Sequence, residues 1–191
     1  PHWIPSLYGN GYPLLAEGET GTLSPLNALV LFIFPFPLAV NGLYLIYFLI
    51  AVTGVIHFLK PYRLSFLARL LGGLVFSLSG FMVSRYFQPA IIFSAALLPW
   101  GMSGVGRWWL PFIIYLQLTA GHLQIALISA LAYLALRSFS GVRRFLHTLV
   151  LIGLGFTLSA VQLLPSFNLY QLSDRRSWDS MLRFTYSLPA S

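Results

Sequence analysis

Residues 115–133 read YLQLTAGHLQIALISALAY, an apolar stretch with Gly121, His122 and Gln124 near its centre. It lies within 29 consecutive residues, Trp108 to Leu136, that include no Lys, Arg, Asp or Glu. One straight helix over this run would be about 43 Å long, more than the ~30 Å hydrocarbon core of a bilayer requires, and it would hold Gln117, His122 and Gln124 near mid-depth. A hairpin that turns at residues 120–122 instead gives two short arms of about 20 Å each.

Charge counting does not choose between the straight helix and the hairpin. Either arrangement places seven of the eleven basic residues on one side of the membrane, so the positive-inside rule is satisfied equally. Polar side chains inside lipid are costly unless they face a cavity, and a turn at Gly121 and His122 provides one. We therefore favour the hairpin, with a water-filled depression at its turn. One side then carries Lys60, Arg63, Arg69, Arg107, Arg137, Arg143 and Arg144, and the other carries His122, Gln124, Arg85, Arg175, Arg176 and all four acids, Glu17, Glu19, Asp174 and Asp179.

The composition is that of an integral membrane protein. Of the 191 residues, 58% are hydrophobic and only 8% are charged, whereas a soluble domain carries about 25% charged residues. The net charge of +7 is explained by anchors at the membrane faces rather than by a nucleic-acid-binding surface, so we expect no nucleic-acid partner. The chain has no cysteine, which excludes disulfides and thiolate metal sites.

The expected fold is an all-α polytopic transmembrane helical bundle with about six membrane segments and one large external loop. Residues 1–37 are rich in Gly and Pro and form the external or interfacial loop segment, in which 26–34 is too short to span. Residues 38–164 form the transmembrane helical bundle, and residues 165–191 form an external tail leading to a missing C-terminal part. The segments expected within the bundle are Leu38–Leu59, Phe66–Ser84, a short helix between Pro89 and Pro99, the two hairpin arms, and Phe145–Leu164, which Pro165 closes.

Five stretches along nearly the whole chain carry a family resemblance. They are GYPLLAEGETGTLSPLN at 11–27, SGF at 79–81, LPW at 98–100, AGHLQ at 120–124 and QLLPSFNLYQLSDR at 162–175. In this order and spacing they resemble the YfhO-like bacterial membrane proteins, a branch of the GT-C superfamily of polytopic glycosyltransferases. One departure is Leu123, because the family usually has proline after the histidine.

The resemblance implies transfer of a sugar from a polyprenyl-phosphate donor to an envelope glycan or polymer. The reaction would take place at the outer face of the bacterial cytoplasmic membrane, so the expected partners are membrane lipids and the polyprenyl-phosphate sugar. A carboxylate in the first external loop of GT-C enzymes usually activates the acceptor or holds a metal ion, which makes a divalent metal a possible cofactor. The family pattern places that catalytic acid before Pro1, and we expect this chain to be part of a longer polypeptide.

Four polar residues are candidates for holding the lipid phosphate. His122 and Gln124 can donate hydrogen bonds from the turn, and histidine can also transfer a proton near neutral pH. Arg175 can pair with a phosphate through two parallel hydrogen bonds, and Arg85 stands at the outer end of a span. The structural alternatives are hydrogen bonding to backbone groups freed by the turn for the first pair, and membrane anchoring for the two arginines.

Glu17 and Glu19 stand two residues apart in a glycine-rich loop. Paired carboxylates serve as acids, bases or metal ligands, although two glutamates in such a loop are also commonly just solvated. His57 could ligate a haem or chlorophyll, but a packed, hydrogen-bonded histidine is commoner. Two other functions stay open: a non-catalytic integral membrane subunit that packs in a larger membrane complex, and a lipid transporter, which the lack of an internal repeat disfavours.

Overall fold

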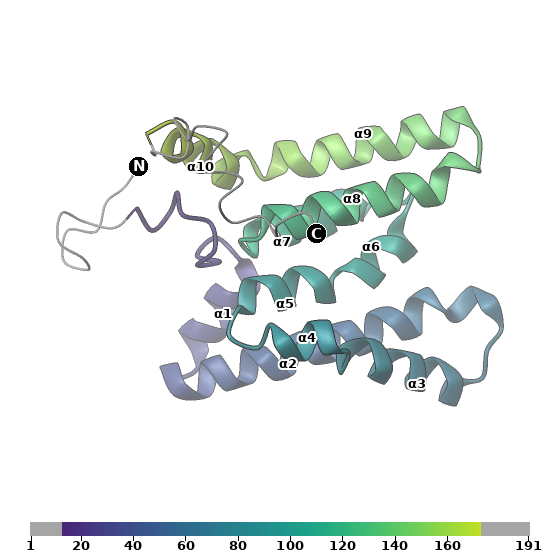
Figure 1. Cartoon of the computed structure of the whole chain (residues 1–191), viewed down its shortest axis with the longest axis horizontal. Coiled ribbons are helices and arrows are strands. Elements are labelled where there is room, and N and C mark those ends of the chain that lie inside the picture. Colours follow the sequence, from purple (N-terminus) through teal and green to yellow (C-terminus); the bar gives the residue numbers. More distant parts are fainter. Residues whose placement is uncertain (1–12, 173–191) are drawn as a thin grey trace, which may run out of the picture.

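The computed structural model describes residues 13–172, and every regular element within them is helical. This confirms the predicted all-α fold. Figure 1 shows most helices lying along one long direction, whereas α10 turns across it. The elements are α1 (Pro25–Ile33), α2 (Phe36–Phe58), the 3-10 helix η1 (Lys60–Tyr62), α3 (Phe66–Ser77), α4 (Gly80–Ser84), α5 (Pro89–Ala96), α6 (Leu98–Gly104), α7 (Leu110–Thr119), α8 (Leu123–Ser138), α9 (Val142–Leu158) and α10 (Ala160–Leu172).

The connections between helices gather at two ends of the molecule (Figure 1). One end, here called the basic end, comprises residues 59–65, 105–109 and 137–144. The opposite end, here called the acidic end, comprises residues 13–24, 85–88 and 120–122. At each end lies a cavity that is lined by residues from all three segments of that end. Six of the seven basic residues that the hairpin groups on one side lie in the basic end: Lys60, Arg63, Arg107, Arg137, Arg143 and Arg144.

The hairpin prediction is confirmed, and a straight helix over residues 108–136 is excluded. α7 ends at Thr119, the backbone turns, and α8 runs back from Leu123 (Figure 1). Gly121 makes the turn with φ of +110°, a backbone conformation that residues with a Cβ rarely adopt.

Two helical segments are long and apolar enough to cross a membrane alone: Phe36–Tyr62, which is α2 with η1, and Phe66–Ser84, which is α3 with α4. α9 and α10 reach that length only together, with a bend of 70° between them. The other apolar helices are shorter, and α8, with 16 residues, would extend only about 24 Å. The described residues therefore supply two or three spanning helices, and the predicted six membrane segments are not confirmed.

The predicted last span is not one continuous helix in the structure. We expected one helix over 145–164 closed by Pro165, but α9 ends at Leu158 and Pro165 lies inside α10. The chain bends at Ser159, whose hydroxyl donates to the Gly155 carbonyl at 2.8 Å. A serine that bonds back to the preceding turn in this way commonly bends a helix.

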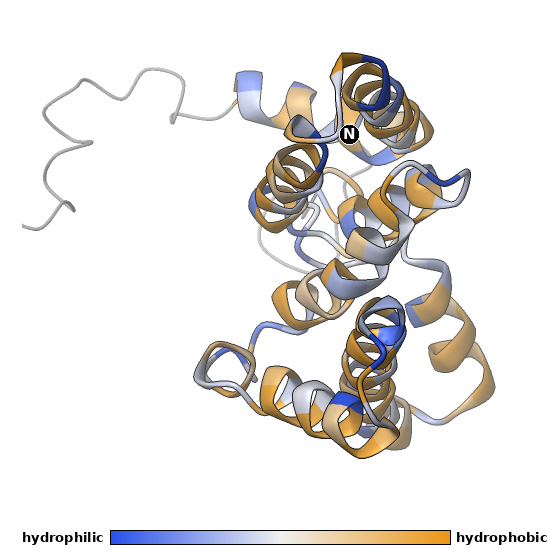
Figure 2. Cartoon of the chain, turned by 90° about the vertical axis from the view of Figure 1, so that its right-hand side faces the viewer, coloured by the Kyte–Doolittle hydropathy of each residue, from blue (hydrophilic) through white to orange (hydrophobic). Residues whose placement is uncertain are grey.

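Two apolar cores hold the helices together. One lies around α2 and α5 and includes Tyr47 and Phe93, whose rings stack with centroids 4.7 Å apart. The other lies among α6, α7, α8 and α9 and includes Leu110 and Ile114, both fully buried. Apolar side chains also cover the outside, and Figure 2 shows mainly hydrophobic helices with hydrophilic segments at their connections. This distribution suits a lipid-facing surface.

A buried polar network joins α5, α7 and α8 around Gln117, which has no exposed surface. Its side-chain nitrogen donates to the Ser94 carbonyl at 2.9 Å and to the Ser129 hydroxyl at 3.0 Å. The Ser94 hydroxyl donates in turn to the Gln117 carbonyl at 3.0 Å. Gln117 is one of the polar residues in the charge-free run 108–136, and its hydrogen bond to Ser129 holds the two hairpin arms together.

Candidate functional site

The candidate site at the acidic end begins with residues 13–24, an ordered loop held by side chains of α10 and α1, the second of which is itself held by α2. The α10 side chain of Gln162 donates to the Leu15 carbonyl at 3.0 Å. Asn27, in α1, donates to the Gly21 carbonyl at 3.4 Å and accepts a 2.5 Å hydrogen bond from the Tyr47 hydroxyl of α2. The loop is thus positioned by the helical bundle, as expected for an ordered segment of this composition.

The loop lies directly on the hairpin turn, backbone against backbone. A Cβ atom on Gly121 would lie 2.1 Å from the carbonyl oxygen of Gly18, closer than any real contact. On the other side of the contact, a Cβ on Gly21 would lie 3.0 Å from the carbonyl oxygen of Ala120. Gly18 and Gly21 also have positive φ, at +67° and +60°. The glycines of the two sequence motifs therefore form one interface.

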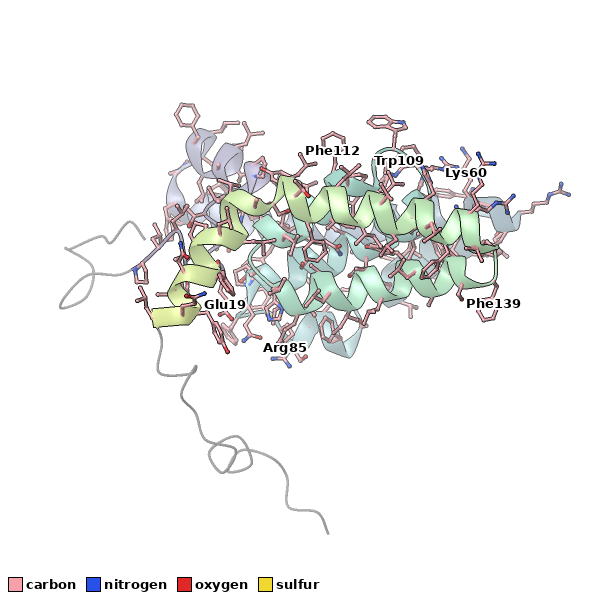
Figure 3. The ribbon with its side chains drawn as sticks, turned by 90° about the horizontal axis from the view of Figure 1, so that it is seen from above. Glu19, Lys60, Arg85, Trp109, Phe112 and Phe139 are labelled. Atoms are coloured by element: carbon pink, nitrogen blue, oxygen red, sulfur yellow. The ribbon has the colours of Figure 1, made fainter. Side chains whose placement is uncertain are left out.

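A small cavity of about 120 Å³ lies where the loop, the turn and the start of α5 meet. Glu19 and His122 both line it, together with Gln88. Arg85 donates from Nη1 to Oε1 of Gln88 at 3.0 Å. The arginine itself does not line the cavity but contacts a residue that does. Figure 3 shows Glu19 and Arg85 toward one end of the molecule and Lys60 toward the other. The structure thus brings together three of the residues predicted from sequence.

Two titratable atoms at this end are buried without a hydrogen bond to any other described residue. They are Oε2 of Glu17 and Nδ1 of His122. A buried polar atom usually has a partner, so such atoms are places where an added group gains the most from binding. An imidazole can donate to a phosphate or carry a proton, and a carboxylate can accept a proton from a hydroxyl.

The other predicted site residues are not part of this cavity. Gln124 lies exposed in the first turn of α8 and does not line it. Arg175 lies outside the described residues, as do the acids Asp174 and Asp179. Within residues 13–172, no three His, Asp or Glu side chains come close enough together to hold a metal ion.

Sequence reasoning missed two glutamines that shape the acidic end, Gln88 and Gln162. Gln162 is in the motif QLLPSF but was not singled out, because nothing in the sequence links it to Leu15, 147 residues away. Reasoning from sequence also missed a second and larger cavity, of about 710 Å³, at the basic end. His57 lines that cavity and stacks on Trp100 with ring centroids 5.1 Å apart.

No family model, no curated protein and no solved structure matches this chain. The resemblance to YfhO-like proteins therefore rests on the five sequence stretches. Parts of three of them are in contact at the acidic end: the loop motif 11–27 touches the turn motif 120–124 through its glycines, and it accepts a hydrogen bond from the motif 162–175 through Gln162.

Proposed function

We propose that this chain is the membrane-embedded part of a GT-C-like glycosyltransferase. It would transfer a sugar from a polyprenyl-phosphate donor to an envelope glycan or polymer at the outer face of the bacterial cytoplasmic membrane. The observation that carries the proposal is the docking of loop 13–24 on the turn 120–122, with Glu19 and His122 on one cavity. Stretches that are far apart in sequence and carry the resemblance thereby form one polar site at an end of an apolar bundle.

The separation of charge supports the outward orientation of this site. The basic end holds six cationic side chains, and both described acids, Glu17 and Glu19, lie at the other end. Basic residues collect on the cytoplasmic side of membrane proteins, so the acidic end is assigned to the outside. The family resemblance implies that the lipid-linked donor reacts at this same outer face.

The chemistry would use the acidic-end residues to manage charge on the reacting groups. In the transfer step the acceptor hydroxyl oxygen bonds to the anomeric carbon, and the bond from that carbon to the phosphate oxygen breaks with its electron pair going to the phosphate. The hydroxyl proton must pass to a base, which the family pattern places in an external loop before Pro1. His122 and Arg85 are candidates for donating hydrogen bonds to the departing phosphate, whose negative charge grows during the step.

The volume of the cavity limits what it can hold. At about 120 Å³ it is smaller than the 300–1,000 Å³ of typical small-molecule pockets, so it has room for a phosphate or a hydroxyl group rather than for a whole sugar. The donor sugar would lie outside it, toward the membrane surface. This small volume is also the observation that favours the alternative function, a non-catalytic membrane subunit of a larger membrane complex.

Sugar transfer in membranes that contain the full-length protein tests the proposal. His122→Ala and Arg85→Ala should each lower transfer from a polyprenyl-phosphate donor by about 10²- to 10³-fold, the scale of losing one preorganised electrostatic contact. His147→Ala and Arg143→Ala are matched controls, because both residues are exposed and lie away from the acidic end. Full activity of both acidic-end variants would remove these residues from the mechanism. Absence of transfer by the wild type across a range of donors would support the subunit instead.

A further inference from the structure

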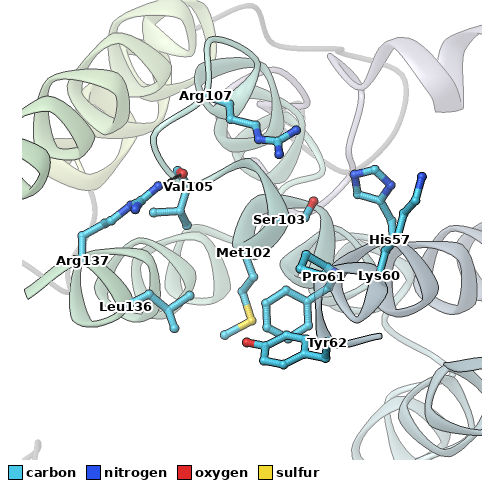
Figure 4. A pocket seen from close by; sticks show the side chains of 11 residues that line it. His57, Lys60, Pro61, Tyr62, Met102, Ser103, Val105, Arg107, Leu136 and Arg137 are labelled. Atoms are coloured by element: carbon cyan, nitrogen blue, oxygen red, sulfur yellow. Dashed lines mark hydrogen bonds between the residues drawn. The ribbon is translucent and has the colours of Figure 1, made fainter. Parts of the chain in front are cut away.

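The cavity at the basic end has the size and the lining of a ligand-binding site. Its volume is about 710 Å³, within the range of small-molecule pockets. Figure 4 shows its lining side chains arranged around one space, and they come from parts of the chain that are distant in sequence. The polar ones are His57 at the end of α2, Lys60 and Tyr62 in η1, Ser103 in α6, Arg107 after α6 and Arg137 in α8.

The charge of this cavity is uniformly positive. Lys60, Arg107 and Arg137 line it without any acidic side chain, and the glutamates of the described chain, Glu17 and Glu19, lie at the acidic end. Three cations around one space repel one another unless an anion lies between them. The lining therefore selects for a negatively charged ligand.

Both arginines of the cavity make specific contacts within the protein, Arg107 from an exposed position and Arg137 from a half-buried one. The guanidinium of Arg107 lies over the Trp109 ring, 4.8 Å from its centroid. Arg137 donates through Nη2 to the Val105 carbonyl, and its buried Nε makes no hydrogen bond within the described residues. A Cβ on Gly106 would lie 2.6 Å from Nη2 of Arg137, so a glycine at this position leaves room for the guanidinium. Such preorganisation reduces the entropic cost of binding an anion.

The rest of the lining indicates that the anion is attached to an apolar body. Phe58, Met102 and Leu136 form apolar walls beside the cations. The cavity also lies at the end of Phe36–Tyr62, a segment apolar and long enough to span, which would place it at the level of the lipid headgroups. Basic pockets between helices on the cytoplasmic side are suited to lipid headgroups that carry phosphate.

We propose that the cavity lined by Lys60, Arg107 and Arg137 binds the phosphate of an anionic phospholipid from the cytoplasmic leaflet. The arginines and the lysine hold the phosphate oxygens through charge-assisted hydrogen bonds, and the apolar walls accept the glycerol and the upper acyl chains. The site is at the opposite end from the transfer site, so it does not depend on the proposed glycosyl transfer. An anionic lipid bound there would join α2, α6 and α8.

The test compares lipid binding to the full-length protein in detergent by native mass spectrometry. The probes are phosphatidylglycerol, phosphatidylcholine and inorganic phosphate. Phosphatidylglycerol should be retained in preference to phosphatidylcholine. The double variant Lys60→Gln/Arg107→Gln should weaken its binding about 30-fold, since each basic residue near a membrane surface contributes about 1 kcal/mol, and tenfold is 1.4 kcal/mol. Neither side chain makes a hydrogen bond or ion pair within residues 13–172, and Arg107→Gln removes only the contact of an exposed guanidinium with the Trp109 ring, so we expect the double variant to fold.

The matched control is Arg143→Gln, which removes a cation from the same end of the molecule without touching the cavity. It should change phosphatidylglycerol binding by less than about twofold, in contrast to the cavity variant. An equal loss of phosphatidylglycerol binding in Arg143→Gln would show that the lipid is held only by general electrostatic attraction to the basic surface, and it would overturn the proposal. Displacement of the lipid by millimolar inorganic phosphate would identify a soluble phosphate as the occupant and would also overturn it. Unchanged retention in the double variant would remove the cavity from lipid binding.

Discussion

Replacing Gly121 by Ala should undock loop 13–24 from the hairpin turn. The new Cβ would lie 2.1 Å from the Gly18 carbonyl oxygen, a backbone atom that cannot rotate away. Gly121 also has φ of +110°, so the alanine adds backbone strain. The strain costs about 1–3 kcal/mol and forced overpacking adds about 1–3 kcal/mol, for a total loss of roughly 2–6 kcal/mol in the free energy that holds the docked state.

Gly141→Ala separates these two contributions. Gly141 has φ of +97°, close to that of Gly121, but a Cβ there would meet nothing within 4 Å. It should therefore show only the strain, about 1–3 kcal/mol, and it lies at the basic end, far from the loop. Gly141→Ala should therefore leave loop 13–24 docked, and exposure of the loop in Gly121→Ala alone would report the contact between the loop and the turn.

The assay uses the absence of natural cysteines, which allows a single cysteine to report on the loop. Ala16 is only 3% exposed, so Ala16→Cys should react slowly with a maleimide when Gly121 is present. In a protein that also carries Gly121→Ala, it should react at least about tenfold faster, because a loss of 1.4 kcal/mol in docking free energy is a factor of ten. Thr22→Cys, on the exposed side of the loop, should react fast in both. If Ala16→Cys stayed equally protected beside Gly121→Ala and Gly141→Ala, the turn would not be what holds the loop.

Three further predictions concern packing and the residues beyond the described range. Gln117→Ala should lower the free energy of unfolding, measured by thermal denaturation in detergent, by about 1–3 kcal/mol. The variant loses hydrogen bonds between membrane helices, worth about 0.6 kcal/mol each, and leaves a cavity. Gln124→Ala, at an exposed position, should be nearly neutral. Gly155→Ala should cost about 1–3 kcal/mol in the same thermal assay, since its Cβ would lie 2.7 Å from Cβ of Ile114. Gly153→Ala, whose Cβ would meet nothing within 4 Å, should be neutral or stabilising. Similar melting temperatures for the two variants would contradict the close packing of α7 on α9. In the sugar-transfer assay, Arg175→Ala should lose about 2–4 kcal/mol of transition-state stabilisation, Arg175→Lys should recover part of it, and Arg183→Ala should cost little; equal losses in the two alanine variants would indicate a general folding effect.

The hairpin could be predicted because its cause is local. A glycine beside a histidine, midway in a charge-free run too long for one span, is a signal that the sequence carries by itself. The short helix at the start also follows from local rules, since Ser24 caps α1 and Pro25 opens it. The contact between Gly18 and Gly121, in contrast, joins residues about a hundred positions apart, and no single motif reveals it.

Two features of the structure were not predicted, the bend at Ser159 and the basic cavity. Proline is the strongest local helix breaker, so Pro165 was expected to end the last span, yet the bend occurs at Ser159. The basic cavity escaped prediction for a different reason, because it depends on tertiary structure. Lys60, Arg107 and Arg137 each look like a membrane anchor in sequence, and only the fold brings them to one space.

Transfer at the outer face requires the acidic end to lie outside and the basic end inside, and this sidedness can be measured in intact bacteria. Thr22→Cys in loop 13–24 and Ser140→Cys at the basic end, each in the full-length protein, are exposed to a membrane-impermeant maleimide before and after the membrane is opened. We expect Thr22→Cys to react in intact cells and Ser140→Cys to react only after opening. Labelling of Ser140→Cys from outside, with Thr22→Cys protected, would place the Glu19 and His122 cavity in the cytoplasm and contradict transfer at the outer face.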